Sequence, residues 1–188
     1  QGKYTEAEPL FKRVLEVRRK TLGSEHPEVA ASLHNLASLY SKQGKYAEAE
    51  SLFKQSLALS ENALGVEHPL VARSLNNRAE LYRLQGRYAE AEPLLKQALA
   101  IYEKILRAEH PHAAESLNNL AEIYKAQGKY AEAEPLYKKA LAIMEKTLVP
   151  EHPDLVKILE NYADLLRKMG REDEAAKMEA SAQGMRVK

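Results

Sequence analysis

The sequence of 188 residues contains no cysteine and no tryptophan, and it has almost no excess of charge of either sign. Without cysteine the protein can form no disulfide, no thiol nucleophile and no cysteine-ligated zinc site. Its 28 lysines and arginines balance 27 aspartates and glutamates, for a net charge of +1. Nucleic-acid and membrane-surface binders normally carry a basic excess. We therefore expect neither a nucleic acid nor a membrane as a partner, and a cytoplasmic location fits this composition.

Long apolar runs are also lacking. No run reaches the roughly 18 residues that would span a bilayer, although hydrophobic residues make up 45% of the chain and can build a sizeable core. The chain starts at Gln1, inside one of the repeated motifs described next. We therefore expect it to be cut from a longer array.

Two short motifs recur along the sequence with a period of 42 residues. Gln-Gly-Lys-Tyr or Gln-Gly-Arg-Tyr occurs four times, and its glycines are Gly2, Gly44, Gly86 and Gly128. Glu-His-Pro also occurs four times, at residues 25–27, 67–69, 109–111 and 151–153. Two markers with one period indicate a repeat architecture, in which each unit packs only against its neighbours.

Each repeat is predicted to form two amphipathic helices. After the first Glu-His-Pro motif, Val29, Leu33, Leu36 and Tyr40 have the spacing of one face of an α-helix. We call the helix that follows Glu-His-Pro the first-type helix, and the helix that follows Gln-Gly-Lys-Tyr the second-type helix. No segment alternates with the period of two that is typical of strands. The markers predict helices at approximately residues 3–22, 27–43, 45–64, 69–85, 87–106, 111–127, 129–148, 153–169 and 171–183.

This pattern predicts an all-α fold, a right-handed α-solenoid of helix–turn–helix repeats in a single domain, 1–188. Residues 1–26 should form an orphan second-type helix. Full repeats should follow at 27–68, 69–110 and 111–152, and residues 153–188 should form a polar capping repeat at the carboxyl end. Gly44 and its equivalents should adopt the left-handed conformation just past a helix end.

The histidines of Glu-His-Pro are candidate metal ligands, but their spacing argues against a metal site. Zinc needs three or four ligands around one point, whereas equivalent positions on packed helices lie roughly 8–10 Å apart or more. The sequence therefore predicts that these histidines cap loops, with no metal and no cofactor; they are His26, His68, His110 and His152. No nucleophile elbow, Gly-rich phosphate loop or HExxH string is present, so we expect no enzymatic activity.

The repeated columns resemble a known family. The tetratricopeptide repeat signature is matched by Leu33, Leu36, Ala37, Tyr40, Gly44, Tyr46, Ala49, Phe53 and Leu57. The 42-residue length, with Leu-Asn-Asn-Leu-Ala at 117–121 and Glu-His-Pro between units, is similar to the kinesin light chain class. This resemblance implies a superhelix that performs no chemistry and whose concave surface, lined by first-type helices, holds extended peptides.

The polar faces of the first-type helices carry the candidate binding residues. One asparagine recurs every 42 residues, as Asn35, Asn77, Asn119 and Asn161. Because an asparagine side chain offers both donors and an acceptor, it can bracket a peptide unit of a bound strand. Alternatively, each asparagine bonds a backbone carbonyl or a neighbouring helix. The other candidates on these faces are Arg73, Asn76, Arg83, Asn118, Lys125 and Lys157, and His34, Ser38 and Lys42 are expected there too.

Two further features concern packing. The tyrosines of the signature columns, such as Tyr4, Tyr40 and Tyr82, are expected to pack between helices with a polar tip. Arg78 replaces a leucine at a core position. A charge in the core costs several kcal/mol unless it is paired, so we expect Arg78 to form a local ion pair or to reach the groove beside Arg73.

These observations together predict a protein–protein interaction scaffold that binds an extended peptide or a partner helix in its concave groove. The alternative is a passive structural or sensor arm of a larger multidomain signalling protein. In that alternative the convex or end surface carries self-association. The exposed first helix, with Val14, Leu15 and Val17, could also form dimers that have no biological meaning.

Overall fold

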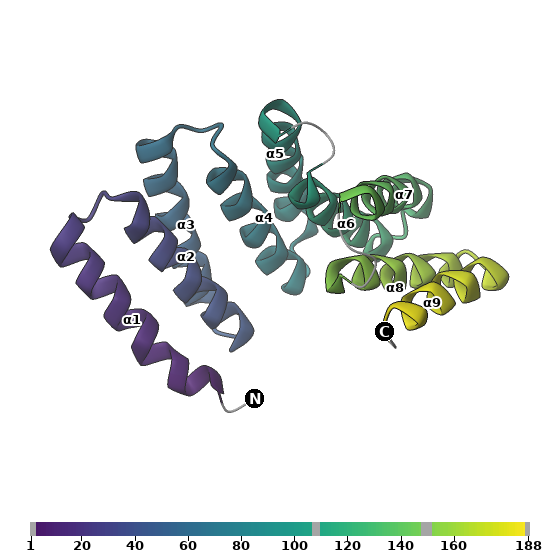
Figure 1. Cartoon of the computed structure of the whole chain (residues 1–188), viewed down its shortest axis with the longest axis horizontal. Helices are drawn as coiled ribbons and strands as arrows, with labels where there is room; N and C mark the ends of the chain where they lie inside the picture. The colour runs from purple at the N-terminus through teal and green to yellow at the C-terminus, as the bar shows by residue number, and fades with distance from the viewer. Residues whose placement is uncertain (1–2, 107–109, 148–151, 187–188) are drawn as a thin grey trace. The chain divides into compact units, whose positions relative to one another are not determined.

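The computed structural model describes residues 3–106, 110–147 and 152–186, and this part of the chain consists of helices joined by short turns (Figure 1). The first glycine of the repeated motif, Gly2, lies outside the described residues. Nine helices lie within them: α1 (Lys3–Leu22), α2 (Pro27–Lys42), α3 (Tyr46–Leu64), α4 (Pro69–Leu84), α5 (Tyr88–Leu106), α6 (Pro111–Ala126), α7 (Tyr130–Thr147), α8 (Pro153–Lys168) and α9 (Glu172–Arg186). The predicted all-α repeat architecture is confirmed.

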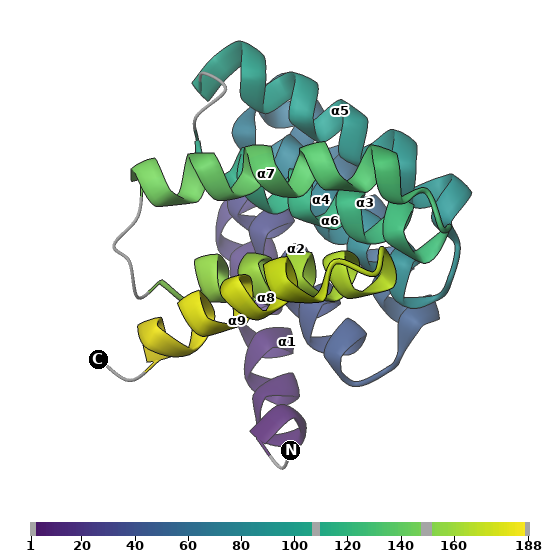
Figure 2. The same cartoon turned by 90° about the vertical axis from the view of Figure 1, so that its right-hand side faces the viewer.

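The chain divides into two compact units, Gln1–Ile101 and Tyr102–Lys188, and the division falls within α5. In the first unit α2 packs against both α1 and α3, and α3 packs against α4. In the second unit α7 packs against both α6 and α8, and α8 packs along α9 (Figure 2). Each unit therefore consists of first-type and second-type helices in alternation.

Each first-type helix begins in the same way. The histidine before it is extended, and its Nδ1 accepts a hydrogen bond from the backbone N–H two residues later. For His26 the distance from Nδ1 to the Glu28 nitrogen is 3.2 Å. Proline then occupies the first turn, where its missing N–H is not needed. The four histidines, which were predicted to cap loops, thus cap the starts of helices, and each satisfies a donor that the first turn leaves without a partner.

The first-type helices also end alike. Gly44 has a φ of 77°, and Gly86, Gly128 and Gly170 have φ values of 72°, 74° and 74°. After α2, the Lys45 N–H donates to the Tyr40 carbonyl at 2.9 Å and the Gly44 N–H donates to the Ser41 carbonyl at 3.0 Å. This pair of bonds closes the helix end and requires a left-handed residue between the helix and the turn.

The core of the first unit lies among α1, α2, α3 and α4. Leu33 and Leu36 of α2 are at most 4% exposed and belong to the same cluster as Phe53 of α3 and Leu81 of α4. Among the residues of α1 whose burial is described, only Leu15 is buried in this cluster. The prediction that Leu15 lies on the exposed face with Val14 and Val17 is therefore wrong, because Leu15 points toward the opposite side of α1 and packs in the core.

The second unit has its own core, and its helix α9 is largely polar. Tyr137 and Met144 of α7 are fully buried, together with Ile123 of α6 and Leu165 of α8. Among the described residues of α9, only two alanines are buried.

Candidate peptide-binding groove

Two adjoining cavities in the first unit form a groove along α2. The first cavity has a volume of about 490 Å³ and is lined by Tyr4, Ala7, Phe11, Asn35, Ser38, Leu39 and Lys42. The second has a volume of about 320 Å³ and is lined by Ser38, Ser41, Lys42, Phe53, Asn77, Glu80 and Leu84. Because Ser38 and Lys42 line both cavities, we treat the two as one surface and call it the α2–α4 groove.

Helical spacing explains why these side chains share the groove. Asn35, Ser38 and Lys42 of α2 are three and four residues apart, so they lie on one face of the helix. The same spacing in α4 brings Asn77 together with Glu80 and Leu84. The repeat period thus aligns equivalent faces of α2 and α4 along the groove. The apolar wall from α1, formed by Tyr4, Ala7 and Phe11, was not predicted as part of the site, because all the predicted site residues belong to first-type helices.

The column asparagines differ in their surroundings. Asn35 is exposed in the groove. Asn77 lines the groove and its Nδ2 lies 2.8 Å from Nε2 of His34. In the second unit, Asn161 Nδ2 donates to Asn118 Oδ1 at 3.0 Å. Asn77 and Asn161 therefore bond a neighbouring first-type helix, which is the alternative that the sequence left open.

Three other candidate asparagines are largely buried. Asn76, Asn118 and Asn119 are 6%, 3% and 9% exposed. Asn76 and Asn118 directly precede column positions, so their side chains turn from the polar face of the helix toward its packed side. A ligand could reach these amides only if neighbouring side chains moved.

Some of the predicted basic site residues form ion pairs within the protein, and others do not. Lys125 is 10% exposed, and its Nζ lies 2.6 Å from Glu122 Oε1 and 2.8 Å from Asp164 Oδ2. Arg83 forms two hydrogen bonds with Glu80, of 2.6 Å and 2.8 Å. Both cations are thus held by carboxylates of the protein itself, and a ligand would have to compete for them.

Arg73, Lys157 and Lys42 have more open surroundings. Arg73 is half-buried, and its buried Nε has no hydrogen-bond partner. Lys157 and Lys42 are exposed, and within the described part of the chain no ion pair is recorded for either. Of these three cations, Lys42 lines the α2–α4 groove.

His34 is an uncharged ring on the packed side of α2. It is 5% exposed, and its ring meets that of Phe53 edge-on with centroids 5.4 Å apart. Burial, with a smaller contribution from the Arg73 charge, lowers its pKa to about 4. Since Nε2 is within hydrogen-bonding distance of the Asn77 amide, we assign the single ring proton to Nδ1, which is buried without a partner.

A carboxylate cluster that recurs between helices was missed at the level of sequence. Glu50 of α3 accepts a hydrogen bond from the Tyr82 hydroxyl at 2.9 Å and pairs with Arg87 at 2.7 Å and Lys54 at 2.7 Å. The Arg87 guanidinium is the main reason why the pKa of Glu50 is lowered to about 2.

The same cluster recurs 42 residues earlier. Glu8 accepts from the Tyr40 hydroxyl at 3.2 Å and pairs with Lys45 at 2.9 Å. Its pKa is lowered to about 2, chiefly by the Lys12 ammonium and then by Lys45. The 42-residue spacing of these glutamates and of the basic residues that follow Gly44 and Gly86 was the available signal. These clusters attach α1 to α2 and α3 to α4, and so position the helices of the groove.

The last repeat forms its cluster with a different tyrosine. Leu166 stands where α2 and α4 have Tyr40 and Tyr82. One turn earlier, the Tyr162 hydroxyl donates to Glu134 Oε1 at 3.1 Å, and Arg171 pairs with the same oxygen at 2.8 Å. Tyr162 thus supplies the hydroxyl that Leu166 lacks, and the glutamate keeps a tyrosine partner.

Arg78 bonds a tyrosine, and no carboxylate in the described part of the chain forms the predicted ion pair with it. Its Nε and Nη2 donate to the Tyr82 hydroxyl at 3.1 Å and 2.8 Å, and its guanidinium lies over the Tyr82 ring at 5.2 Å from the centroid. Because that hydroxyl in turn donates to Glu50, Arg78 joins the carboxylate cluster through the tyrosine. Tyr40 and Tyr82 are buried as expected, whereas Tyr4 is 40% exposed beside the groove.

Within the described ranges, no three histidine, aspartate or glutamate side chains are placed to hold a metal ion. None of the helices described is long and apolar enough to cross a membrane.

Comparison with known proteins agrees with this geometry. The tetratricopeptide repeat family matches residues 1–62, 36–104 and 112–186. The chain belongs to the tetratricopeptide repeat family. Proteins built from these repeats generally act as scaffolds for protein–protein interaction. No curated protein matches the chain.

Several solved structures are similar to the tetratricopeptide chain. A kinesin light chain-like protein of nearly identical tetratricopeptide-like repeats from Podosopora anserina is 35% identical, with a TM-score of 0.74, and the match covers 99% of this chain and 88% of that one. BtubC from P. vanneervenii is 23% identical, with a TM-score of 0.82 and coverages of 99% and 74%. MamA is 17% identical, with a TM-score of 0.62 and coverages of 99% and 90%. The latter two matches support the fold alone.

Proposed function

We propose that the chain is a non-enzymatic binding module that holds an extended peptide or a partner helix in the α2–α4 groove. The observation that supports this function is the pair of adjoining cavities, about 490 and 320 Å³ in volume, into which α2 and α4 bring Asn35, Lys42 and Asn77. An extended peptide offers an N–H and a C=O at every residue, and an asparagine amide can bond both kinds of group.

The two walls of the groove offer different kinds of contact, one apolar and the other polar. Tyr4 and Phe11 supply apolar area on one side, and removing apolar area from water favours association. On the other side the exposed Asn35 and Lys42 remain available for polar contacts. Glu80 lies in the same groove as Lys42, so the mixed charges do not select a strongly acidic ligand.

A random-peptide selection tests this function. The parent chain should enrich a linear motif, and the double variant Asn35→Ala, Lys42→Ala should lose that enrichment. The matched control is Asn62→Ala, Lys177→Ala, which removes the same two side-chain types at exposed positions on α3 and α9. Circular dichroism should confirm that both variants remain helical. Equal enrichment by all three proteins would contradict binding in this groove.

The passive arm is the second candidate, and the hydrogen bonds of Asn77 with His34 and of Asn161 with Asn118 support it. Asparagines used in this way hold neighbouring helices together and need no ligand. For a passive arm the parent chain should enrich no motif. The selection therefore separates the two functions.

A further inference from the structure

The side-chain amide of Asn77 is bonded at one end and open at the other. Its Nδ2 lies 2.8 Å from Nε2 of His34, and the residue lines the second cavity of the α2–α4 groove. Among the described residues no donor is recorded for its Oδ1, and this oxygen is not a buried atom. Because an asparagine amide has its donors at one end and its acceptor at the other, the contact with His34 turns the acceptor toward the cavity.

His34 is held in the position that this contact requires. Its side chain is 5% exposed, and its ring meets that of Phe53 edge-on with centroids 5.4 Å apart. Phe53 is itself 2% exposed and lines the same cavity. In a neutral imidazole one nitrogen donates and the other accepts. With the ring proton on Nδ1, Nε2 can only accept, so it bonds the nitrogen of the Asn77 amide and not its oxygen.

The second unit shows the same orientation with a different acceptor. Asn118 and Asn161 stand two repeats after His34 and Asn77. Asn161 Nδ2 donates to Asn118 Oδ1 at 3.0 Å, and Asn118 Nδ2 donates to Asn119 Oδ1 at 3.4 Å. Since the nitrogen of Asn118 is engaged within its own helix, only its oxygen is offered to Asn161. In both units, therefore, the column asparagine turns its nitrogen toward an acceptor on the preceding first-type helix.

We propose that His34 is a positioning residue that directs Oδ1 of Asn77 toward the ligand, where this oxygen accepts a hydrogen bond from a backbone N–H of the bound peptide. The inference rests on the proposed function and specifies which end of the amide meets the ligand. Lys42 lines the same cavity, is exposed and has no ion pair recorded within the described residues, so it would repel a cationic ligand group. Glu80 is already held by Arg83. The ligand donor that fits is therefore an uncharged backbone N–H.

The tautomer of His34 tests the positioning role without any ligand. In the isotope-labelled chain, long-range proton–nitrogen correlation spectra distinguish the protonated ring nitrogen from the unprotonated one. We expect the proton on Nδ1 at neutral pH. A proton on Nε2 would overturn the proposal, because that nitrogen would then donate and would require the oxygen of Asn77 as its acceptor.

Peptide analogues test the contact with the ligand. The probe is a peptide enriched by the parent chain, with one backbone N–H at a time removed, either by an ester or by N-methylation. Both changes remove a donor, and only the ester also weakens the neighbouring carbonyl. At one position both should weaken binding about tenfold, as expected for one lost hydrogen bond. With Asn77→Ala this penalty should disappear, which identifies Asn77 as the partner of that N–H.

Two variants at residue 34 separate positioning from packing. His34→Leu keeps an apolar side chain against Phe53 but offers Asn77 no acceptor, so the penalty at that position should fall below about threefold. His34→Asn should restore the full penalty, since asparagine accepts at the equivalent position of the second unit. A residue that only packs against Phe53 would not produce this loss and rescue. Thermal unfolding should confirm that both variants are folded.

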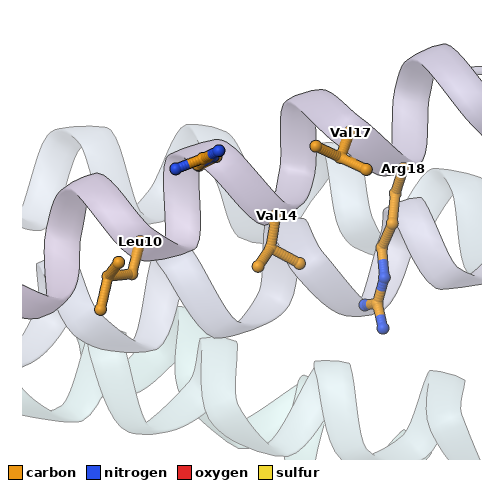
Figure 3. Close-up of a pocket in the computed structure, with 5 residues that line it drawn as sticks. Leu10, Val14, Val17 and Arg18 are labelled. Carbon is orange, nitrogen blue, oxygen red and sulfur yellow. The ribbon is translucent and has the colours of Figure 1, made fainter.

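A separate cavity on α1 provides the control surface. It has a volume of about 310 Å³, and its lining includes Leu10, Val14 and Val17 (Figure 3). A peptide bound there would make mainly apolar contacts, which do not depend on one N–H. Val17→Lys changes a side chain that is 51% exposed in this cavity. It should leave both the affinity and the penalty unchanged, and a loss of affinity would place the peptide on α1 and overturn the proposal.

The outcomes distinguish this inference from the proposed function. Suppose that a peptide is enriched and that Asn35→Ala, Lys42→Ala abolishes its binding, but no penalty depends on Asn77 and His34. The inference would then be wrong and the proposed function would stand. If the parent chain enriches no peptide, the proposed function fails, and the contact between Asn77 and a ligand fails with it.

Discussion

The polar faces of α2 and α6 occupy the same place in the repeat but have opposite surroundings. On α2, Asn35 and Lys42 are exposed and line the α2–α4 groove. On α6, Asn119 is 9% exposed, and Lys125 is enclosed by Glu122 and Asp164. The repeat period alone therefore does not determine which polar side chains can meet a ligand.

One position on each helix contributes to this difference. Where α6 has Glu122, α2 has Ser38. A serine carries no charge that would attract a neighbouring lysine, whereas Glu122 holds the Lys125 ammonium at 2.6 Å. Ser38 forms no ion pair with Lys42, so the polar face of α2 stays exposed. On α6, Glu122 pairs with Lys125, so this lysine is bound to another side chain of the same helix.

The largest expected effect concerns His34, which stands where α6 has Asn118. The pKa of His34 is about 4 in the folded protein and should be near 6.5 when unfolded, so the unfolded state binds more protons between these values. The free energy of unfolding should therefore decrease by up to about 3 kcal/mol as the pH falls from 6.5 to 4. Urea unfolding at several pH values measures this decrease.

His34→Asn is the control for that measurement. In this variant the free energy of unfolding should depend much less on pH between 4 and 6.5, because asparagine does not titrate. The new asparagine could still accept a hydrogen bond from Asn77, as Asn118 accepts one from Asn161. The lowered pKa of His110 should leave a smaller residual slope in the same window. The lowered pKa of Glu50 acts separately, since its contribution is present above pH 4.5 and is lost as the pH falls toward 2. Identical slopes for parent and variant would contradict the account of His34.

A second prediction compares lysines on the two faces. Lys125→Met should lower the free energy of unfolding by about 2 kcal/mol, because Glu122 and Asp164 then face each other without a cation between them. Lys42→Met should change it by less than about 0.5 kcal/mol, since Lys42 is exposed. Urea unfolding at neutral pH checks both. Equal losses would mean that the two faces do not differ as described.

The smallest expected effect concerns the asparagine column. Asn161→Ala should cost about 1 kcal/mol of stability, because it removes the bond to Asn118 and leaves that amide oxygen without its donor. Asn35→Ala should be close to neutral. Thermal unfolding of the two variants, side by side, gives the comparison. A cost for Asn35→Ala as large as that for Asn161→Ala would show that Asn35 also has a structural role.

The fold could be predicted because local signals and packing agree in every repeat. Glu-His-Pro and the motif of Gly44 mark helix ends through capping chemistry, which depends on adjacent residues. The apolar spacing between these marks then defines one buried face. For these reasons the predicted helix ends lie within one residue of those observed, except at the end of α9.

The site could be predicted only in part, because it depends on contacts between helices. The column of Asn35 and Asn77 follows from helical spacing. The burial of His34 and Asn118 and the pairing of Lys125 with Asp164 depend on the neighbouring helix, which spacing within one repeat does not describe. Tyr162 is another example. Its hydroxyl bonds Glu134 as the Tyr82 hydroxyl bonds Glu50, although the two tyrosines occupy different positions in the repeat.

Backbone amide chemical shifts provide the most direct test of the central claim that the α2–α4 groove is the binding surface. A peptide enriched by the parent chain would be titrated into the isotope-labelled protein. The account predicts shift changes centred on residues 35–42 and 77–84, with residues 119–126 little affected. Changes centred on residues 119–126, or an even response along all first-type helices, would contradict it.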